Sequence, residues 1–111
     1  MKRLISLFSL FLSQVFPSQA ESDRLIVGME LEYPPFEFVA NDGTNDGVSV
    51  KMAEALADYL GRALEIQNIK FDALITALKS DNIDLIISSM TATDERRKSI
   101  NFSAKSESNQ A

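Results

Sequence analysis

The sequence predicts an α/β fold in which a largely parallel sheet is flanked by helices. Short apolar runs, typical of buried strands, alternate with segments whose apolar residues recur at i, i+3, i+4 and i+7, the spacing of one helix face. Strands that alternate with helices are joined by right-handed crossovers and therefore run parallel. The 111 residues leave room for one modest domain.

The first predicted strand is followed by a turn-rich segment. Residues 24–29 form a compact apolar run bounded by charge and glycine, which is typical of a buried strand. Residues 36–39 alternate in polarity, and residues 41–47 are dense in Asn, Asp and Gly, which tolerate positive φ. We therefore expect a turn or hairpin loop at residues 41–47.

Two amphipathic helices and a strand between them come next. The first helix is expected to start at Ser49 as its N-cap and to stop at Gly61 as its C′ residue. A strand is expected at residues 64–69. The apolar stripe of the first helix is Ala53, Leu56, Ala57 and Leu60, and that of the second is Phe71, Leu74, Ile75 and Leu78.

The last predicted elements are a strand and a short helix. Residues 83–87 are expected to form a strand that is buried on both faces, because four of the five side chains are apolar and branched. Thr93 is a candidate N-cap for a short helix that carries acids in its first turn.

The first twenty residues have the pattern of a secretory signal. A basic start precedes the apolar residues 4–16, and residues 17–20 offer small side chains at the cleavage positions. We expect cleavage after Ala20 and a periplasmic product. A membrane anchor is the alternative, but residues 4–16 are fewer than the roughly 20 needed to span a bilayer. A lipid anchor of the bacterial lipoprotein type would need a Cys, and the sequence has none.

The predicted domain occupies residues 21–103. Residues 104–111 carry no large apolar side chain and are expected to form a disordered tail. No internal repeat is visible in the sequence.

Composition excludes several classes of function. Without His or Cys, the chain cannot use thiolate nucleophiles, imidazole acid/base groups, the usual zinc sites or disulfides. The formal net charge is −5, and the one basic cluster is the short run at residues 96–98, which argues against nucleic-acid binding. We expect no cofactor and no metal.

Two segments follow the carboxyl ends of predicted parallel strands, where open α/β sheets bind ligands. Residues 28–36 leave the first strand and contain consecutive prolines, whose rings fix their backbone φ at about −65°. Residues 88–97 combine hydroxyls and free backbone N–H groups with a following Arg. Such a combination is suited to binding a carboxylate.

Five segments in order resemble the N-terminal lobe of the family 3 periplasmic solute-binding proteins. They are VGMELEYPPF at 27–36, DGV at 46–48, FDALI at 71–75, IDLIISSMTATDER at 83–96 and INFS at 100–103. The resemblance covers about residues 24–103, and SSMTATDER is its most specific part. It implies a partial first lobe of the type II periplasmic binding protein fold. It also implies a monomeric amino-acid-binding component that serves the membrane permease of an ABC importer.

The resemblance implies a carboxylate site after the last strand. Arg96 matches the arginine that grips the ligand α-carboxylate through a bidentate fork. Thr91 matches the residue whose backbone N–H joins that site and whose hydroxyl helps to hold the α-amino group. Ser88 and Ser89 match positions that contact the ligand ammonium or backbone. The alternatives are that Arg96 is a solvated helix residue and that the two serines simply end a strand.

A side-chain pocket is implied as well. Tyr33 and Phe71 match the aromatic pair that sandwiches the ligand side chain, and Glu30 matches an acidic position that faces the cationic end of basic ligands. Glu30 therefore favours Arg, Lys or His as the ligand. The alternatives are that Phe71 packs in the core, that Tyr33 anchors a loop and that Glu30 is surface charge.

The sequence departs from the family pattern after residue 103, where family members continue into an Asp-Pro-aromatic motif and a second lobe. Ser49 and Lys51 also stand where the family often carries acids. We therefore expect a truncated copy whose site is open to water and binds at millimolar affinity or not at all.

Two other functions are possible on the same scaffold. One is an enzyme resembling periplasmic cyclohexadienyl dehydratases, which is disfavoured because the sequence lacks His and a second lobe. The other is a ligand-sensing input domain, which would need a transmembrane segment downstream. We expect a binding protein and not an enzyme.

Overall fold

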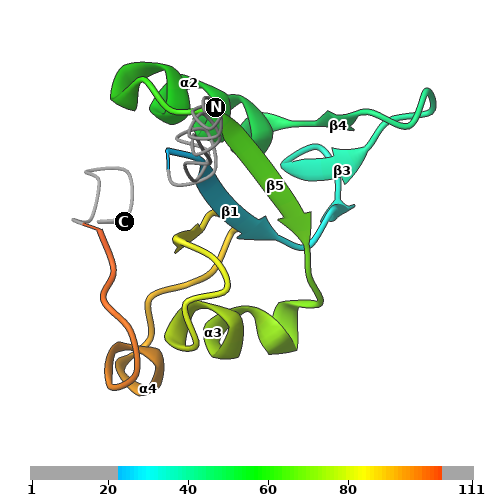
Figure 1. Cartoon of the computed structure of the whole chain (residues 1–111). Coiled ribbons are helices and arrows are strands. Elements are labelled where there is room, and N and C mark those ends of the chain that lie inside the picture. Colours follow the sequence, from blue (N-terminus) through cyan, green and yellow to red (C-terminus); the bar gives the residue numbers. More distant parts are fainter. Residues whose placement is uncertain (1–22, 104–111) are drawn as a thin grey trace, which may run out of the picture.

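The computed structural model describes residues 23–103 (Figure 1). The predicted signal segment and the predicted tail lie outside the described residues, and so do residues 21–22 at the start of the predicted domain. The elements in chain order are β1 (Leu25–Met29), β2 (Glu32–Tyr33), β3 (Glu37–Val39), β4 (Asn45–Asp46), α2 (Val48–Leu60), β5 (Leu64–Asn68), α3 (Phe71–Lys79), β6 (Leu85–Ile86) and α4 (Asp94–Arg97). None of the helices in this range has the length and apolar character needed to cross a membrane.

The main sheet has the strand order β5-β1-β6, and both pairings are parallel. Leu25 pairs with Leu64 and Val27 pairs with Leu85, so β1 is the central strand. This arrangement confirms the predicted α/β class with a parallel sheet. The crossovers carry α2 before β5 and α3 before β6.

The two long helices cover opposite faces of the main sheet (Figure 1). Alternate residues of β1, from Leu25 to Met29, pack against Val50, Ala53 and Ala57 of α2 to form the core. The other face of β1 meets α3, where a Cβ on Gly28 would stand 3.1 Å from Leu74 Cδ2 and 2.6 Å from Ile83 Cδ1. Glycine therefore allows α3 to approach the sheet closely.

A second, smaller sheet of order β2-β3-β4 is antiparallel and lies beside the start of α2. The predicted turn joins β3 to β4: the Gly43 N–H donates to the Ala40 carbonyl, and the Ala40 N–H donates to the Thr44 carbonyl. Gly43 has a φ of 87°, which explains the glycine. The sequence did not predict β2 or β4 as strands, because two-residue strands carry no measurable periodicity.

The prediction that Ser49 caps the first helix is wrong. The helix begins at Val48, and Gly47 is the N-cap with a φ of 113°. The first two helical N–H groups donate to the carbonyls of Pro35 and Phe36, so the turn before β3 replaces a side-chain cap. Ser49 lies in the first helical turn and is buried. The other end is as predicted, since Gly61 ends the helix with a left-handed φ of 68°.

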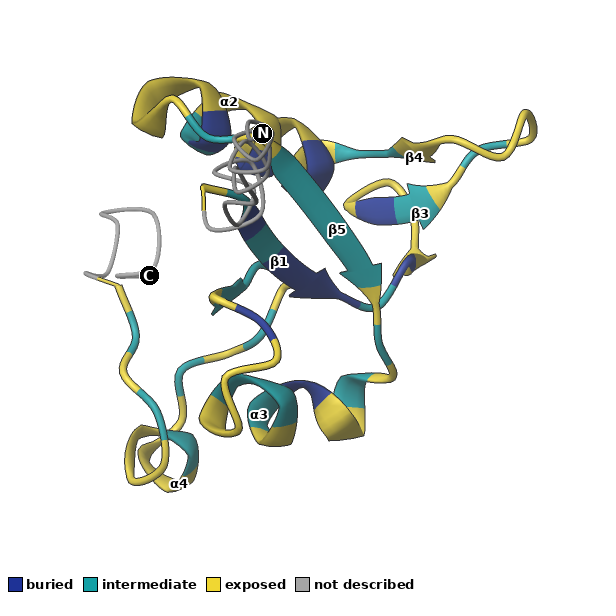
Figure 2. Cartoon of the chain, viewed as in Figure 1, coloured by how far each residue is buried: buried dark blue, intermediate teal, exposed yellow. Residues whose placement is uncertain are grey.

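The prediction that residues 83–87 form a strand buried on both faces is also wrong. The strand is limited to Leu85–Ile86, and its side chains are half-buried. Within residues 23–103, β6 pairs only with β1 and forms an edge of the sheet. Ile83 is buried, but it precedes the strand and packs toward α3. Figure 2 shows the contrast between the buried β1 and the half-buried β6.

Candidate amino-acid-binding site

The segments predicted to bind a ligand meet at one edge of the main sheet. Because β1, β5 and β6 are parallel, the residues after each strand emerge at the same edge. Glu30 follows β1, Phe71 opens the helix after β5, and residues 88–91 follow β6. We call this region the ligand edge.

Hydrogen bonds tie the strand ends together at the ligand edge. Ser88 is 4% exposed, and its hydroxyl accepts the Glu30 N–H at 2.9 Å. The Leu31 N–H donates to Asn68 Oδ1 at 3.0 Å, which joins the end of β5 to the same loop. The Ser88 hydroxyl thus holds two strand ends in register, and the segment after β1 has a fixed path.

Ser89 is exposed and takes a φ of 54°, in the left-handed region. Its hydroxyl donates to Glu37 Oε1 at 3.2 Å. The hydroxyl of Ser49 donates to the same oxygen. Glu37 is 1% exposed, at the buried start of β3 (Figure 2).

Glu37 was not among the residues predicted from the sequence. It stands between two phenylalanines, and in an alternating strand the aromatic side chains are expected to face the core. The structure reverses this: Glu37 is buried, whereas Phe36 is exposed. The only sign of a buried Glu37 in the sequence is that apolar residues flank it. Its partner Ser49 gives no local signal, because it lies 12 residues further along the chain.

Arg96, Thr91 and Phe71 come together beside α4. The Arg96 side chain donates from one guanidinium nitrogen to the Thr91 carbonyl at 2.9 Å, and its Cζ lies 5.3 Å from the centre of the Phe71 ring. Thr93 is the N-cap of α4 as predicted, since its hydroxyl accepts the Arg96 N–H at 3.1 Å. Phe71 is half-buried, whereas Leu74 is the buried residue of α3.

Tyr33 is the last residue of β2 and begins the turn that leads to β3. It is 54% exposed, and its ring centre is 5.3 Å from that of Phe36. No ring contact joins Tyr33 to Phe71 within the described residues. The turn is anchored, because the Phe36 N–H donates to the Tyr33 carbonyl and the start of α2 donates to Pro35 and Phe36.

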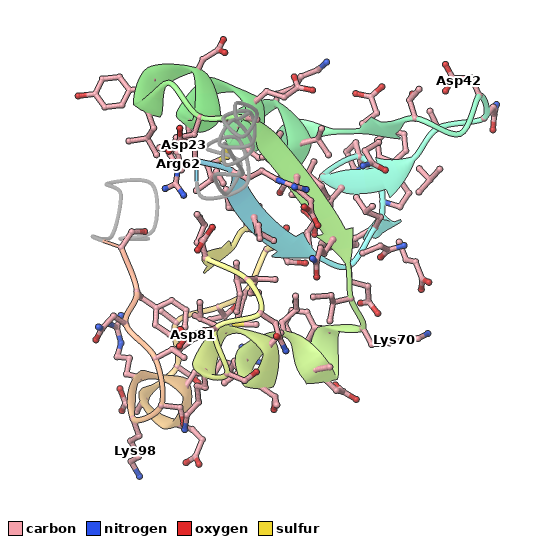
Figure 3. The ribbon with its side chains drawn as sticks, viewed as in Figure 1. Asp23, Asp42, Arg62, Lys70, Asp81 and Lys98 are labelled. Carbon is pink, nitrogen blue, oxygen red and sulfur yellow. The ribbon has the colours of Figure 1, made fainter. Side chains whose placement is uncertain are left out.

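The ligand edge carries one acidic and one basic side chain, Glu30 and Arg96. Glu30 and Arg96 have no ion-pair partner within residues 23–103. The ion pairs found there are Arg24–Glu65, Lys51–Asp46, Lys51–Glu54, Arg62–Asp84 and Lys98–Glu95. Lys70 and Lys98, which flank α3 and α4, point away from the molecule (Figure 3).

Two carboxyl groups outside the ligand edge have shifted pKa values. The Thr44 hydroxyl, helped by the Thr44 N–H, holds the pKa of Asp42 below its ordinary value of 3.8. The Gln67 amide, with Arg24 adding to its effect, lowers the pKa of Glu65. Asp42 lies at the tip of the hairpin (Figure 3). No group of acidic residues in the described part of the chain is arranged to hold a metal ion.

A cavity of about 960 Å³ lies beside β6, between α2 and residues 99–103. Of the predicted site residues, it touches only Ser88 and Ser89. Its lining includes Val48, Met52, Leu56, Leu85, Ile87 and Phe102. The cavity is therefore distinct from the part of the ligand edge formed by Arg96 and Phe71, and most of its lining is apolar, with Lys79 as its one cationic residue.

Comparison with known sequences and structures identifies the family of this chain. Residues 25–111 match the bacterial extracellular solute-binding proteins, family 3, and the chain belongs to this family. This confirms the predicted resemblance. The match extends beyond residue 103, where the resemblance in the sequence analysis stops.

Among curated relatives, the arginine-binding extracellular protein ArtP of Bacillus subtilis is 43% identical over 86 residues. That alignment covers 78% of this chain and 33% of ArtP. The L-arginine-binding protein of Pseudomonas aeruginosa is 40% identical, with 95% of this chain and 41% of the relative covered. The L-cystine-binding protein TcyJ of Escherichia coli is 40% identical, with 75% and 31% covered. The chain thus spans about a third of the length of these relatives.

Solved structures show the same fold. The arginine-bound form of domain 1 from TmArgBP has a TM-score of 0.69 and 40% identity, and covers 76% of this chain and 67% of that one. Holo ArgBP from T. maritima has a TM-score of 0.69 and 44% identity, with 70% of this chain and 34% of that one covered. The chain thus matches about two thirds of that first domain.

Proposed function

We propose that this lobe binds the α-carboxylate of an amino acid with a cationic side chain, as part of the extracytoplasmic binding component of an ABC importer. The observation that carries the proposal is the setting of Arg96. The guanidinium is held at the ligand edge by the Thr91 carbonyl and the Phe71 ring, yet it has no carboxylate partner within residues 23–103. An incoming carboxylate would supply that partner.

The ligand backbone is proposed to lie across residues 88–96. Arg96 presents further N–H donors to the carboxylate, and the fixed fork of a guanidinium suits two carboxylate oxygens. Thr91 contributes its backbone N–H to the carboxylate and its hydroxyl to the α-amino group. Ser89 is exposed and can reach the ligand, whereas the buried Ser88 acts through the strand ends that it joins.

The ligand side chain is proposed to lie between Phe71 and Tyr33, with its cationic end toward Glu30. A planar guanidinium stacks well on an aromatic face. Arginine is the first candidate, because several relatives are named as arginine-binding proteins and domain 1 from TmArgBP is in an arginine-bound form. The relatives named for cystine and histidine make the ligand class wider than arginine.

The setting of the lobe in the cell is part of the proposal. The relatives are extracellular or periplasmic solute-binding proteins and not enzymes. We propose cleavage after Ala20, a domain at residues 21–103 followed by a tail at 104–111, a monomeric product in the periplasm, and delivery of the amino acid to a membrane permease. The chain is proposed to have no enzymatic activity and no cofactor.

An NMR titration of the ¹⁵N-labelled full chain with L-arginine tests the proposal. Saturable shifts should appear in the backbone amides of residues 88–96, together with Glu30 and Phe71. L-glutamate at the same concentration should cause smaller shifts, because its side chain repels Glu30. Absence of saturable shifts with every amino acid, or shifts confined to the cavity beside β6, would contradict the proposal.

A further inference from the structure

Glu37 is a buried carboxylate that the proposed function does not use. It is 1% exposed, and no ion pair within residues 23–103 includes it. A buried carboxylate lowers stability unless hydrogen bonds replace its water. Two hydroxyls do so here, from Ser49 in the first turn of α2 and from Ser89 in the turn after β6.

The two hydrogen bonds have different consequences. The bond from Ser49 joins β3 to the start of α2, which the carbonyls of Pro35 and Phe36 already hold. The bond from Ser89 crosses between the two sheets and reaches a residue in the left-handed region. A non-glycine residue in that region is strained, so it persists only where contacts fix it.

The turn at Ser89 sets the path of the residues that follow. Ser88 is tied to Glu30 on one side, and Ser89 is tied to Glu37 on the other. Two residues further on, the Thr91 carbonyl accepts the hydrogen bond from Arg96. A change in the Ser89 conformation would therefore move the groups that are proposed to hold the ligand carboxylate.

We propose that Glu37 is a positioning residue for the ligand edge. Its carboxylate holds the Ser89 hydroxyl, and through it the left-handed turn that places Thr91 and Arg96. This inference rests on the proposed function, since the turn matters for binding only if Thr91 and Arg96 bind the ligand. The competing role is a purely structural one, in which a negative charge near the start of α2 stabilises that helix.

Four variants of the full chain separate these roles. Glu37→Leu removes the carboxylate that accepts both hydrogen bonds and fills the space. Glu37→Gln keeps an amide oxygen that can accept a hydrogen bond from a hydroxyl. Ser89→Ala removes the donor. Ser49→Ala is the matched control, because it removes the other bond to Glu37 without affecting Ser89. For each variant, we would measure the amide spectrum of residues 88–91 without ligand, the affinity for L-arginine and the urea midpoint.

Positioning predicts a specific pattern. Glu37→Leu and Ser89→Ala should each shift the amides of residues 89–91 and weaken L-arginine binding about tenfold, the effect of one charge-assisted hydrogen bond. A fifth variant that combines Glu37→Leu with Ser89→Ala should shift the ligand-free amides of residues 90 and 91 no further than Ser89→Ala alone, because both changes remove the same bond. Glu37→Gln should stay within about threefold of the wild type, and Ser49→Ala should lower the urea midpoint but keep affinity within about twofold.

The inference is overturned if Glu37→Leu lowers the urea midpoint as Ser49→Ala does, while the amides of residues 89–91 and the affinity stay unchanged. If Glu37→Leu does not fold, the ligand-free amides of residues 90 and 91 in Ser89→Ala carry the prediction, because the affinity of that variant also loses the proposed contact of Ser89 with the ligand. If the wild-type chain binds no amino acid, the proposed function fails by itself. The ligand-free amide spectra then still decide whether Glu37 holds the turn.

Discussion

At the scale of single residues, the ligand edge has two charges of opposite sign without ion-pair partners within residues 23–103, at Glu30 and Arg96. Arg96 is oriented by Thr91 and Phe71, whereas Glu30 is fixed through its backbone N–H by Ser88. An amino acid with a cationic side chain complements both charges.

Glu30→Gln tests the assignment of the cationic end. We expect the affinity for L-arginine to fall about two- to fivefold, the usual value of an exposed ion pair. The affinity for L-citrulline, a neutral analogue of similar shape, should not change. Glu32→Gln, an exposed acid on β2, is the control. Equal losses for both ligands would show that Glu30 acts on the fold and not on the ligand charge.

Asp42 provides a prediction that is independent of the ligand. Thr44→Val removes the hydroxyl that accounts for most of the lowered pKa of Asp42, but keeps the backbone N–H bond. The pKa of Asp42 should therefore rise toward 3.8 while staying below it, as measured by NMR titration of the carboxyl carbon.

The same bond sets the sign of the pH dependence. Because the folded pKa is below the unfolded one, the stabilisation is present above pH 3.8 and is lost as the pH falls through the folded pKa. As the pH falls from 3.8 through the folded pKa of Asp42, Thr44→Val should lose less stability than the wild type. An unchanged Asp42 titration in Thr44→Val would contradict the role of the hydroxyl.

At the scale of elements, the start of α2 depends on Gly47. Its φ of 113° and ψ of 176° are in a region that is essentially restricted to glycine. An added Cβ would stand 2.5 Å from the Phe36 carbonyl oxygen. The absence of a Cβ lets the turn that carries Tyr33 pack against the start of the helix, where the Val48 and Ser49 N–H groups donate to Pro35 and Phe36.

Gly47→Ala should therefore be more destabilising than Gly43→Ala, which serves as its matched control. Gly43 also has a positive φ, of 87°, but an added Cβ would meet nothing within 4 Å. We expect a loss of about 1–2 kcal/mol for Gly43→Ala, and about 1–3 kcal/mol more for Gly47→Ala because of the backbone clash. Urea unfolding measures both, and equal losses would show that the turn moves away freely.

Local signals in the sequence predicted the elements that depend on local contacts. The two long helices, the strand that became β5, the left-handed Gly61 and the Thr93 cap are set by near neighbours in the chain. The predicted apolar stripe of α2 was wrong at Leu60, which is exposed at the end of the helix. The errors depend on distant contacts. Ser49 was predicted as an N-cap from its position before the helix. The carbonyls of Pro35 and Phe36 accept the first helical N–H groups instead, and they lie too far away in the chain for a local pattern to show this.

For the candidate site, the sequence predicted where the segments meet but not the hydrogen bonds between them. The parallel sheet brought the segments after β1, β5 and β6 to one edge, as expected from the strand order. Sequence could not show that Ser88 is buried or that Glu37 binds Ser89, because both depend on pairings across 52 or 58 residues. The roles of the site residues toward a ligand stay predictions.

At the scale of the whole molecule, the described residues form one lobe whose ligand edge is open. Ser89 and Thr91 are exposed, and Tyr33 is exposed as well. Hydrogen bonds and ion pairs that compete with water are weak, so the lobe by itself should bind L-arginine at millimolar affinity.

A thermal unfolding series of the full chain checks this affinity. With millimolar affinity, about 10 mM L-arginine should stabilise the fold by about 1.4 kcal/mol and raise the Tm by several degrees. Agmatine, which lacks the carboxylate, should have a smaller effect at the same ionic strength. Micromolar affinity would contradict the expectation that an open lobe binds weakly.

The central claim is that Arg96 binds the carboxylate of the ligand. The most direct measurement compares L-arginine with agmatine by NMR titration of the wild-type chain, Arg96→Lys and the neighbouring control Arg97→Lys. The wild type and Arg97→Lys should prefer L-arginine by about tenfold, and Arg96→Lys should lose most of that preference, because an ammonium cannot form the bidentate contact. If Arg96→Lys keeps the full preference for L-arginine, the carboxylate is bound elsewhere and the account is wrong.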